Sequence, residues 1–366
     1  MRIAFTTLIF AHALIHLLGF IKGFGFKEIK ELTLAISKPM GLVWLLAFIL
    51  LAAYGALYML NSKYAGYLGL LAVVISQVLL IMYWKDAKWG TLPNLFILIV
   101  SILSLAQHRF TATVETEIAD LLRHNGAIEP HILKKDDVHR LPAPVKNWLL
   151  HSGAVGKPVI QVGKITQRAE MKMKPDQEKW MAATATQYTT IDSPGFIWQV
   201  KAQMNKLLSF QGRDKFQDGH GEMLIKMNAL IKVVHERGPK LDEGTLQRFL
   251  GEMVWFPSMA LCPYITWEAI DGTRAKAIMT YKGTTGSGIF HFSAAGDVVK
   301  FSALRFKGND ASAQRREWIM DISGYRTFQG IKVPSKMTST WKLNNADWTW
   351  LRLEVTDLNY NDEVKL

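Results

Sequence analysis

The chain has 366 residues, of which 49% are hydrophobic and 20% charged, and its net charge is +12 at pH 7. A single cysteine excludes a small domain held together by disulfides, and the 12 Trp, 10 Tyr and 18 Phe residues exclude a disordered chain. At roughly 150 residues per domain, the length predicts two or three domains.

Four long apolar runs lie in the first 110 residues, at positions 3–21, 41–60, 64–84 and 92–106. A spanning helix needs about 20 apolar residues, a length that the fourth run approaches if Gln107 and His108 sit among lipid headgroups. Residues 1–110 are therefore predicted to form an all-α bundle of four transmembrane helices. The first run could instead be a signal peptide, but no small-residue cleavage site follows it, which favours a retained helix.

Basic residues near the helix ends predict the orientation of this bundle. The first and third links carry six lysines, whereas the opposite side carries Arg2, Lys63 and Arg109. The positive-inside rule then places the two lysine-rich links in the cytoplasm. The expected location is the inner membrane, with everything after Arg109 outside the cytoplasm. The six lysines are Lys22, Lys27, Lys30, Lys38, Lys85 and Lys88.

Polar residues also occur within the spans. His12 and His16 lie four positions apart and so share one face of the first helix. They are weak candidates for a metal or haem site or a proton relay, and the alternative is hydrogen bonding between helices. In the link at 84–91, Asp86 is expected to pair with Lys85 or Lys88.

Residues 111–140 are predicted to connect the bundle to a soluble domain at 141–366. A helix at 115–124 is expected to end at Asn125–Gly126, and a second is expected from Pro142 to Gly153. The net charge divides evenly, +6 before residue 111 and +6 after it. Lysine and arginine alternate with acids throughout the second part, which argues against nucleic acid as a partner.

From residue 158 the hydrophobic pattern changes to a period of two, as in the run 196–204. About eleven or twelve such runs, most separated by turn residues, predict a large antiparallel sheet. One helix interrupts them, with Asp242 as its N-cap and Pro257 after its end. The predicted soluble domain is thus α+β, a curved, half-barrel-like sheet packed on a few helices, with a core or a cavity between them.

Sequence motifs for catalysis are absent: there is no HExxH, GxSxG, Walker A or Rossmann glycine pattern. Cys262 has no companion cysteine and is expected to be buried. Glu268 and Asp271 could serve acid–base chemistry, although solvated turn acids are the simpler interpretation. No catalytic residue and no cofactor is predicted.

Aromatic and charged residues of the soluble domain supply the candidate binding residues. Arg248 and Glu252 lie one helical turn apart, which fits either a half-exposed ion pair or a polar anchor at the mouth of a pocket. The abundant tryptophans fit either a large core or a site for a hydrophobic ligand. Trp348 and Trp350 are expected on one strand face, with Leu351 and Leu353 on the other. The predicted ligand-binding residues are Trp198, Arg248, Glu252, Trp255, Trp348 and Trp350.

Several motifs in the second part occur in one order: Leu141–Pro142, Pro194–Gly195–Phe196–Ile197–Trp198, Gly238–Pro239–Lys240–Leu241–Asp242, Val254–Trp255–Phe256–Pro257 and Trp267–Glu268–Ala269–Ile270–Asp271. This series, from about residue 141 to 361, resembles a bacterial family of uncharacterised proteins, a domain of unknown function. The front end, with the segments 12–20 and 86–91, looks like the membrane portion attached to some members. The resemblance implies a fold similar to the half-barrels of periplasmic lipoprotein carriers.

Three functions remain open from the sequence. The first is a membrane-anchored, extracytoplasmic domain that binds a lipid or another hydrophobic ligand in the concave face of its sheet. The second is a hydrolase or other enzyme that acts on a lipid or cell-envelope substrate. The third is a structural or sensory membrane protein whose soluble part binds another protein. The predicted partners are the membrane bilayer and a hydrophobic or lipid ligand, and nucleic acid is not expected.

Overall fold

The computed structural model describes residues 2–125, 131–344 and 346–364, and the chain divides into two compact units, residues 1–112 and 113–366. Four helices of the first part are long and apolar enough to cross a membrane. They are α1 (Arg2–Gly23), α2 (Lys38–Met59), α3 (Ala65–Met82) and α5 (Thr91–His124), and the short helices α4 (Trp84–Ala87) and η1 (Lys88–Gly90) link the last two.

Helix α5 differs from the prediction of a fourth span followed by a separate connector helix. It runs without a break from Thr91 to His124, because no glycine or proline interrupts the chain after Pro93. Gly126, expected to end the connector helix, lies outside the described residues. The expected pairing of Asp86 with a lysine is also wrong. Its carboxylate instead accepts hydrogen bonds from the Thr33 hydroxyl at 2.7 Å and the Leu34 N–H at 2.9 Å, both in the α1–α2 link.

Small residues allow close approach of helices in the first unit. Gly19 of α1 lies against the indole of Trp44 of α2, where an added Cβ would stand 2.2 Å from a ring carbon. Trp44 is 1% exposed. A small residue at a helix interface allows this close approach of the two helices.

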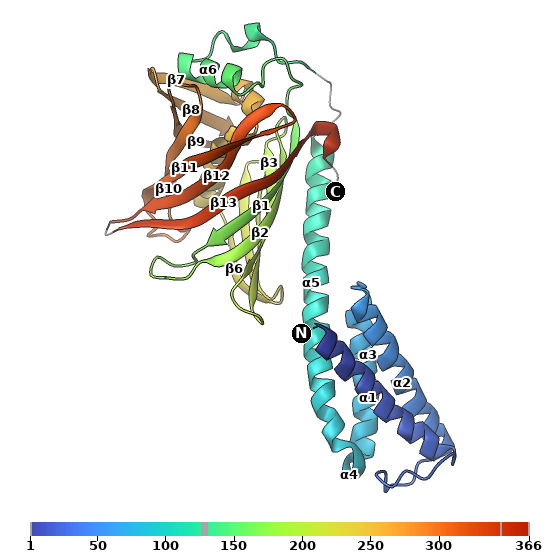
Figure 1. The fold of residues 1–366 in the computed structure, drawn as a ribbon. Coiled ribbons are helices and arrows are strands. Elements are labelled where there is room, and N and C mark those ends of the chain that lie inside the picture. Colours follow the sequence, from blue (N-terminus) through green and yellow to red (C-terminus); the bar gives the residue numbers. More distant parts are fainter. Residues whose placement is uncertain (1, 126–130, 345, 365–366) are drawn as a thin grey trace. The chain divides into compact units, whose positions relative to one another are not determined.

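The second unit is dominated by one 13-stranded sheet in which every pairing is antiparallel. Figure 1 shows the sheet as a strongly curved wall. This confirms the predicted order of apolar helices followed by a large curved antiparallel sheet. The strands are β1 (Val162–Met171), β2 (Met181–Thr190), β3 (Gly195–Gln203), β4 (Ser209–Gln217), β5 (His220–Met227), β6 (Ile231–Arg237), β7 (Ile265–Asp271), β8 (Arg274–Tyr281), β9 (Thr284–Phe292), β10 (Val298–Phe306), β11 (Arg315–Phe328), β12 (Ile331–Lys342) and β13 (Asp347–Tyr360).

The sheet consists of two meanders joined at one seam. Strands β1 to β6 form one meander and β7 to β13 the other, and β1 pairs with β13 where they meet. The strands β6 and β7 therefore lie at opposite edges, and the chain between them must cross the sheet. Helix α7 (Pro239–Gly251) makes this crossing and contacts strands of both halves, β4 and β5 on one side and β8, β9 and β10 on the other.

The core of this unit fills the space between the sheet and the crossing segment. Helix α7 continues into the 3₁₀ turns η3 (Glu252–Trp255) and η4 (Pro257–Leu261). Phe249, Leu250, Met253 and Val254 are at most 1% exposed. On the facing sheet, Gly288 leaves room for the ring of Phe301, from which an added Cβ would be 2.2 Å distant. Burial of this apolar stripe holds the helix in the hollow of the sheet.

Two details differ from the sequence prediction. The sequence pattern predicts twelve of the strands and misses β6. This strand lies at the edge of the sheet with most of its side chains exposed, so it has no clear period-two pattern. Asp242 is not the N-cap of α7, which begins at Pro239 after Gly238 with φ +123°. Its carboxylate accepts a hydrogen bond of 2.7 Å from the Gly221 N–H and so ties α7 to β5. Helix α6 (Ala143–His151) begins and ends close to the predicted positions.

Candidate ligand-binding pocket

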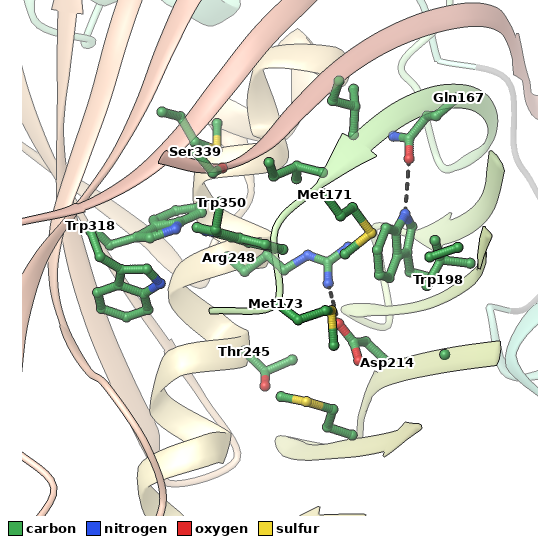
Figure 2. A pocket seen from close by; sticks show the side chains of 18 of the residues that line it. Gln167, Met171, Met173, Trp198, Asp214, Thr245, Arg248, Trp318, Ser339 and Trp350 are labelled. Carbon is green, nitrogen blue, oxygen red and sulfur yellow. Dashed lines mark hydrogen bonds and ion pairs between the residues drawn. The ribbon is translucent and has the colours of Figure 1, made fainter. Parts of the chain in front are cut away.

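A pocket of about 320 Å³ lies between α7 and the concave side of the sheet. This volume is at the lower end of the ~300–1,000 Å³ that small-molecule sites occupy. Figure 2 shows Arg248 and Thr245 reaching into it from the helix, with Met171, Trp198 and Trp318 on surrounding strands. The lining comes from both meanders, so the pocket exists only when the seam between β1 and β13 has formed.

Methionine is the commonest aliphatic side chain in the lining. Methionine side chains are unbranched, flexible and polarizable, and they adapt to apolar ligands of irregular shape. The backbone N–H of Lys172, beside this apolar group, bonds to the Trp350 carbonyl across the seam. The lining methionines are Met171, Met173, Met223, Met320 and Met337.

Tryptophans of β11, β12 and β13 also line the pocket. Trp318 of β11 pairs directly with Trp341 of β12, and Trp341 with Trp348 of β13, so three indoles stand in register across three strands. The β12–β13 register then shifts: Ser339 pairs with Leu351 and Thr340 with Thr349, which leaves Trp350 as an extra residue. The prediction that Trp348 and Trp350 lie on one face of β13 and Leu351 on the other is therefore wrong. The irregularity brings all three side chains to the pocket.

Arg248 is held at the pocket by three acceptors. Its guanidinium donates to Glu252 at 2.7 Å, to Asp214 at 2.8 Å and to the side-chain carbonyl of Gln187 at 3.1 Å. Gln187 in turn donates to Glu252 at 2.7 Å. Burial alone would lower the pKa of Arg248, but the two carboxylates outweigh it and raise the pKa.

This network corrects the interpretation of Arg248 and Glu252 as a half-exposed surface pair. The Glu252 side chain is 7% exposed and that of Arg248 17%. The guanidinium also lies over the rings of Phe196 and Trp198, at 4.6 and 4.8 Å from their centroids. An enclosed ion pair with further hydrogen bonds and ring contacts fixes the position of α7 against β3 and β4.

Five of the six indole N–H groups on the pocket lining fall into two sets. Trp198 donates to Gln167 at 2.9 Å, and Trp255 donates to the Pro334 carbonyl at 3.0 Å. The buried N–H groups of Trp318, Trp348 and Trp350 have no acceptor among the described residues. Buried donors normally find a partner, so these three groups are candidates for contact with a bound molecule.

Arg305 of β10 is a site residue that the sequence analysis missed. Its guanidinium lies 4.2 Å from the ring centroid of Trp318 and 5.7 Å from that of Trp341. No ion pair involves it among the described residues, and its buried Nε has no hydrogen-bond acceptor there. Burial, followed by the nearby charge of Arg248, lowers the pKa of Arg305 to about 9. A signal exists in the period-two pattern, which places Arg305 on the same face as the buried Ala303.

All six predicted ligand-binding residues, Trp198, Arg248, Glu252, Trp255, Trp348 and Trp350, lie on the lining of this one pocket. Their contact with a ligand remains a prediction, and four of the six already bond to protein groups.

Other candidates from the sequence lie elsewhere. Glu268 pairs with Lys276 at 3.1 Å on an exposed strand. A hydrogen bond from the Thr273 N–H, and then one from Arg274, lower the pKa of Asp271 to about 2. Cys262 is half-buried, and burial raises the pKa of its thiol to about 11. These groups are therefore a surface ion pair, a stabilised turn carboxylate and an unreactive thiol.

His12 and His16 lie within a polar network in the first unit. His16 donates from Nδ1 to the His12 carbonyl at 2.9 Å, so its Nε2 accepts from the Ser76 hydroxyl at 2.8 Å. His12 donates to the Asn94 side-chain carbonyl at 2.9 Å. The four side chains are at most 2% exposed and link α1, α3 and α5. Among the described residues, no group of three or more His, Cys, Asp or Glu side chains is placed to hold a metal ion.

These features define a class of protein: helices apolar enough to span a membrane, followed by a curved antiparallel sheet that encloses an apolar pocket beside a crossing helix. The chain belongs to a family of unknown function (DUF6544), whose model matches residues 131–353, more than half of its length. It is similar to a LolA superfamily protein from Nitrosomonas europaea, with a TM-score of 0.34 and 9% identity over 60% of this chain and 94% of that one. No curated protein matches it.

Proposed function

We propose that this protein is an integral membrane protein whose β-rich domain binds a hydrophobic ligand, an acyl chain or similar molecule, in the pocket beside α7. The observation that carries the proposal is the pocket's lining of methionines and tryptophans, most of them contributed by the sheet. An apolar cavity with a few polar groups is the usual form of a site for such a ligand. Several lining residues, among them Met171, Trp318 and Met337, also belong to the hydrophobic core around Phe249 and Phe301, so the pocket is a space left within that core.

The proposal includes membrane insertion through α1, α2, α3 and α5 and an extracytoplasmic β-rich domain. The lysines of the first and third links support this orientation. On the opposite side, Arg2 donates to the carbonyls of Tyr58 and Met59 at 2.7 and 2.6 Å. Because this contact satisfies the last turn of α2, Arg2 has a structural role besides its charge.

The test is photolabelling of the full chain in phosphatidylcholine nanodiscs with a diazirine-bearing fatty alcohol, a neutral single-chain probe. Peptide mapping is expected to find label on pocket residues. Ala202→Phe adds a ring at a buried position in the pocket and should remove that label, whereas Ala182→Phe, exposed on the neighbouring strand, should leave it. Label confined to the membrane helices, or unchanged in Ala202→Phe, would refute the proposal.

A further inference from the structure

The guanidinium of Arg305 is the unusual feature of the pocket. A Cβ added at Gly244 of α7 would lie 3.7 Å from Nε of Arg305 and 3.5 Å from its Nη2. The ring centroid of Trp318 lies 4.2 Å from the guanidinium carbon. The guanidinium thus lies between helix and sheet, against an aromatic ring, with its Nε buried. An enclosed cation that lacks a counterion is costly to the fold, and cation–π contact offsets only part of that cost.

Two other arginines of the same unit, Arg248 and Arg213, each form ion pairs with two carboxylates. Arg248 has two carboxylates, and Arg213 bonds to Glu117 at 3.0 Å and Glu222 at 2.9 Å. The carboxylates of Asp214 and Glu252 face the pocket, but both bond to Arg248. Within the described part of the chain, these two arginines form ion pairs and Arg305 forms none; Glu252 and Asp214 act on it only at longer range, and burial and the charge of Arg248 outweigh their effect on its pKa.

Among the described residues, the buried side-chain groups of the pocket that have no hydrogen-bond partner are all donors. Besides Nε of Arg305, they are the buried indole N–H groups of Trp318, Trp348 and Trp350. An indole N–H only donates, and so does a guanidinium. A molecule that satisfies these groups must bring acceptors, and one that neutralises Arg305 must bring a negative charge.

We propose that Arg305 binds the anionic headgroup of a single-chain amphiphile, a carboxylate or a phosphate, while the methionine-lined part of the pocket takes the acyl chain. This inference rests on the proposed function and names its ligand class. The tryptophan wall of β11, β12 and β13 stands beside the headgroup, and Met171, Met223 and Met337 lie on the remaining lining. Lys307, whose ammonium lies 5.1 Å from the Trp348 ring centroid, adds positive charge near this wall.

The experiment extends the photolabelling of the full chain in phosphatidylcholine nanodiscs. The neutral diazirine alcohol labels the pocket, and unlabelled oleate, oleyl alcohol and oleoyl lysophosphatidate compete at mildly alkaline pH, where the carboxylate is ionised. Oleate should displace the probe at a concentration about tenfold or more below that of oleyl alcohol, the ratio expected for a hydrogen-bonded charge pair. Lysophosphatidate as the stronger competitor would identify phosphate rather than carboxylate as the headgroup.

Variants test whether Arg305 causes the preference for oleate over oleyl alcohol. Arg305→Gln should abolish the preference for oleate over oleyl alcohol, because oleate should compete about tenfold more weakly while oleyl alcohol competes as before. Arg305→Lys should restore part of the preference. Arg326→Gln removes an exposed strand arginine and is the matched control, with no change expected. Equal competition by oleate and oleyl alcohol in the wild type would overturn the headgroup assignment and leave the apolar pocket standing. Absence of pocket labelling would overturn both.

Discussion

Replacing Arg305 by methionine should stabilise the unliganded protein. The substitution removes an enclosed charge without a counterion and keeps an unbranched side chain between Gly244 and Trp318. Replacing buried ionic groups by apolar ones typically gains ~1–4 kcal/mol, and the lost cation–π contact costs ~0.5–2 kcal/mol. The expected net gain is about 1–2 kcal/mol. For a unit of this size it corresponds to a melting temperature higher by roughly 2–8 °C.

The assay is thermal unfolding of the full chain in nanodiscs, followed by intrinsic tryptophan fluorescence. Arg326→Met, at an exposed position on β11, is the control and should stay within about 0.5 kcal/mol of the wild type. Oleate at 100 times its Kd should stabilise the wild type by about 2.7 kcal/mol and the Arg305→Met variant much less. An unliganded Arg305→Met variant that melts below the wild type would refute this reasoning, since the charge would then stabilise the fold without a ligand.

Three further predictions concern the ion pairs and the topology. Burial acts to raise the pKa of Glu222, but the hydrogen bonds of Arg213, Arg237 and His235 outweigh it and lower the pKa to about 2. The stabilisation by the ionised Glu222 is therefore present above about pH 4.5 and lost as the pH falls toward 2. At neutral pH the Glu222→Gln variant should be less stable than the wild type by ~3 kcal/mol. Unfolding measured across an acid titration should show this difference vanish. Arg248→Leu leaves two enclosed carboxylates unpaired and should cost ~3–5 kcal/mol in denaturant unfolding, whereas a loss below 1 kcal/mol would contradict the proposed fixing of α7. Asp176→Cys, exposed between β1 and β2 in a Cys262→Ser background, should react with an impermeant maleimide from the outside of intact cells; reaction only after lysis would reverse the orientation.

The sequence predicts the overall order of elements because each rests on a local pattern. Apolar runs of 15 or more residues indicate the four helices that are apolar enough to span a membrane, and the period-two runs indicate twelve of the thirteen strands described. The six candidate binding residues are aromatic or charged side chains that stand close to apolar ones in the sequence. These residues meet in one pocket because helix α7, which joins the two meanders, must cross the sheet.

Features set by strand register and by distant contacts could not be predicted. Arg305 and Trp318 are 13 positions apart, and their contact depends on the pairing of Trp318 with Ala303 across β10 and β11. Trp348 and Leu351 reach the same pocket only through the register shift at Trp350. Such a shift costs little locally and leaves no pattern in the sequence, although it moves every later side chain to the other face.

The measurement that tests the central claim most directly is native mass spectrometry of the delipidated full chain after incubation with oleate in phosphatidylcholine nanodiscs. The structure predicts one bound oleate per chain in the wild type and in Ala182→Phe. It predicts none in Ala202→Phe, whose added ring occupies the pocket. A wild-type protein that binds no oleate, or an Ala202→Phe variant that binds it as well as the wild type, would contradict the claim that this pocket holds an apolar chain.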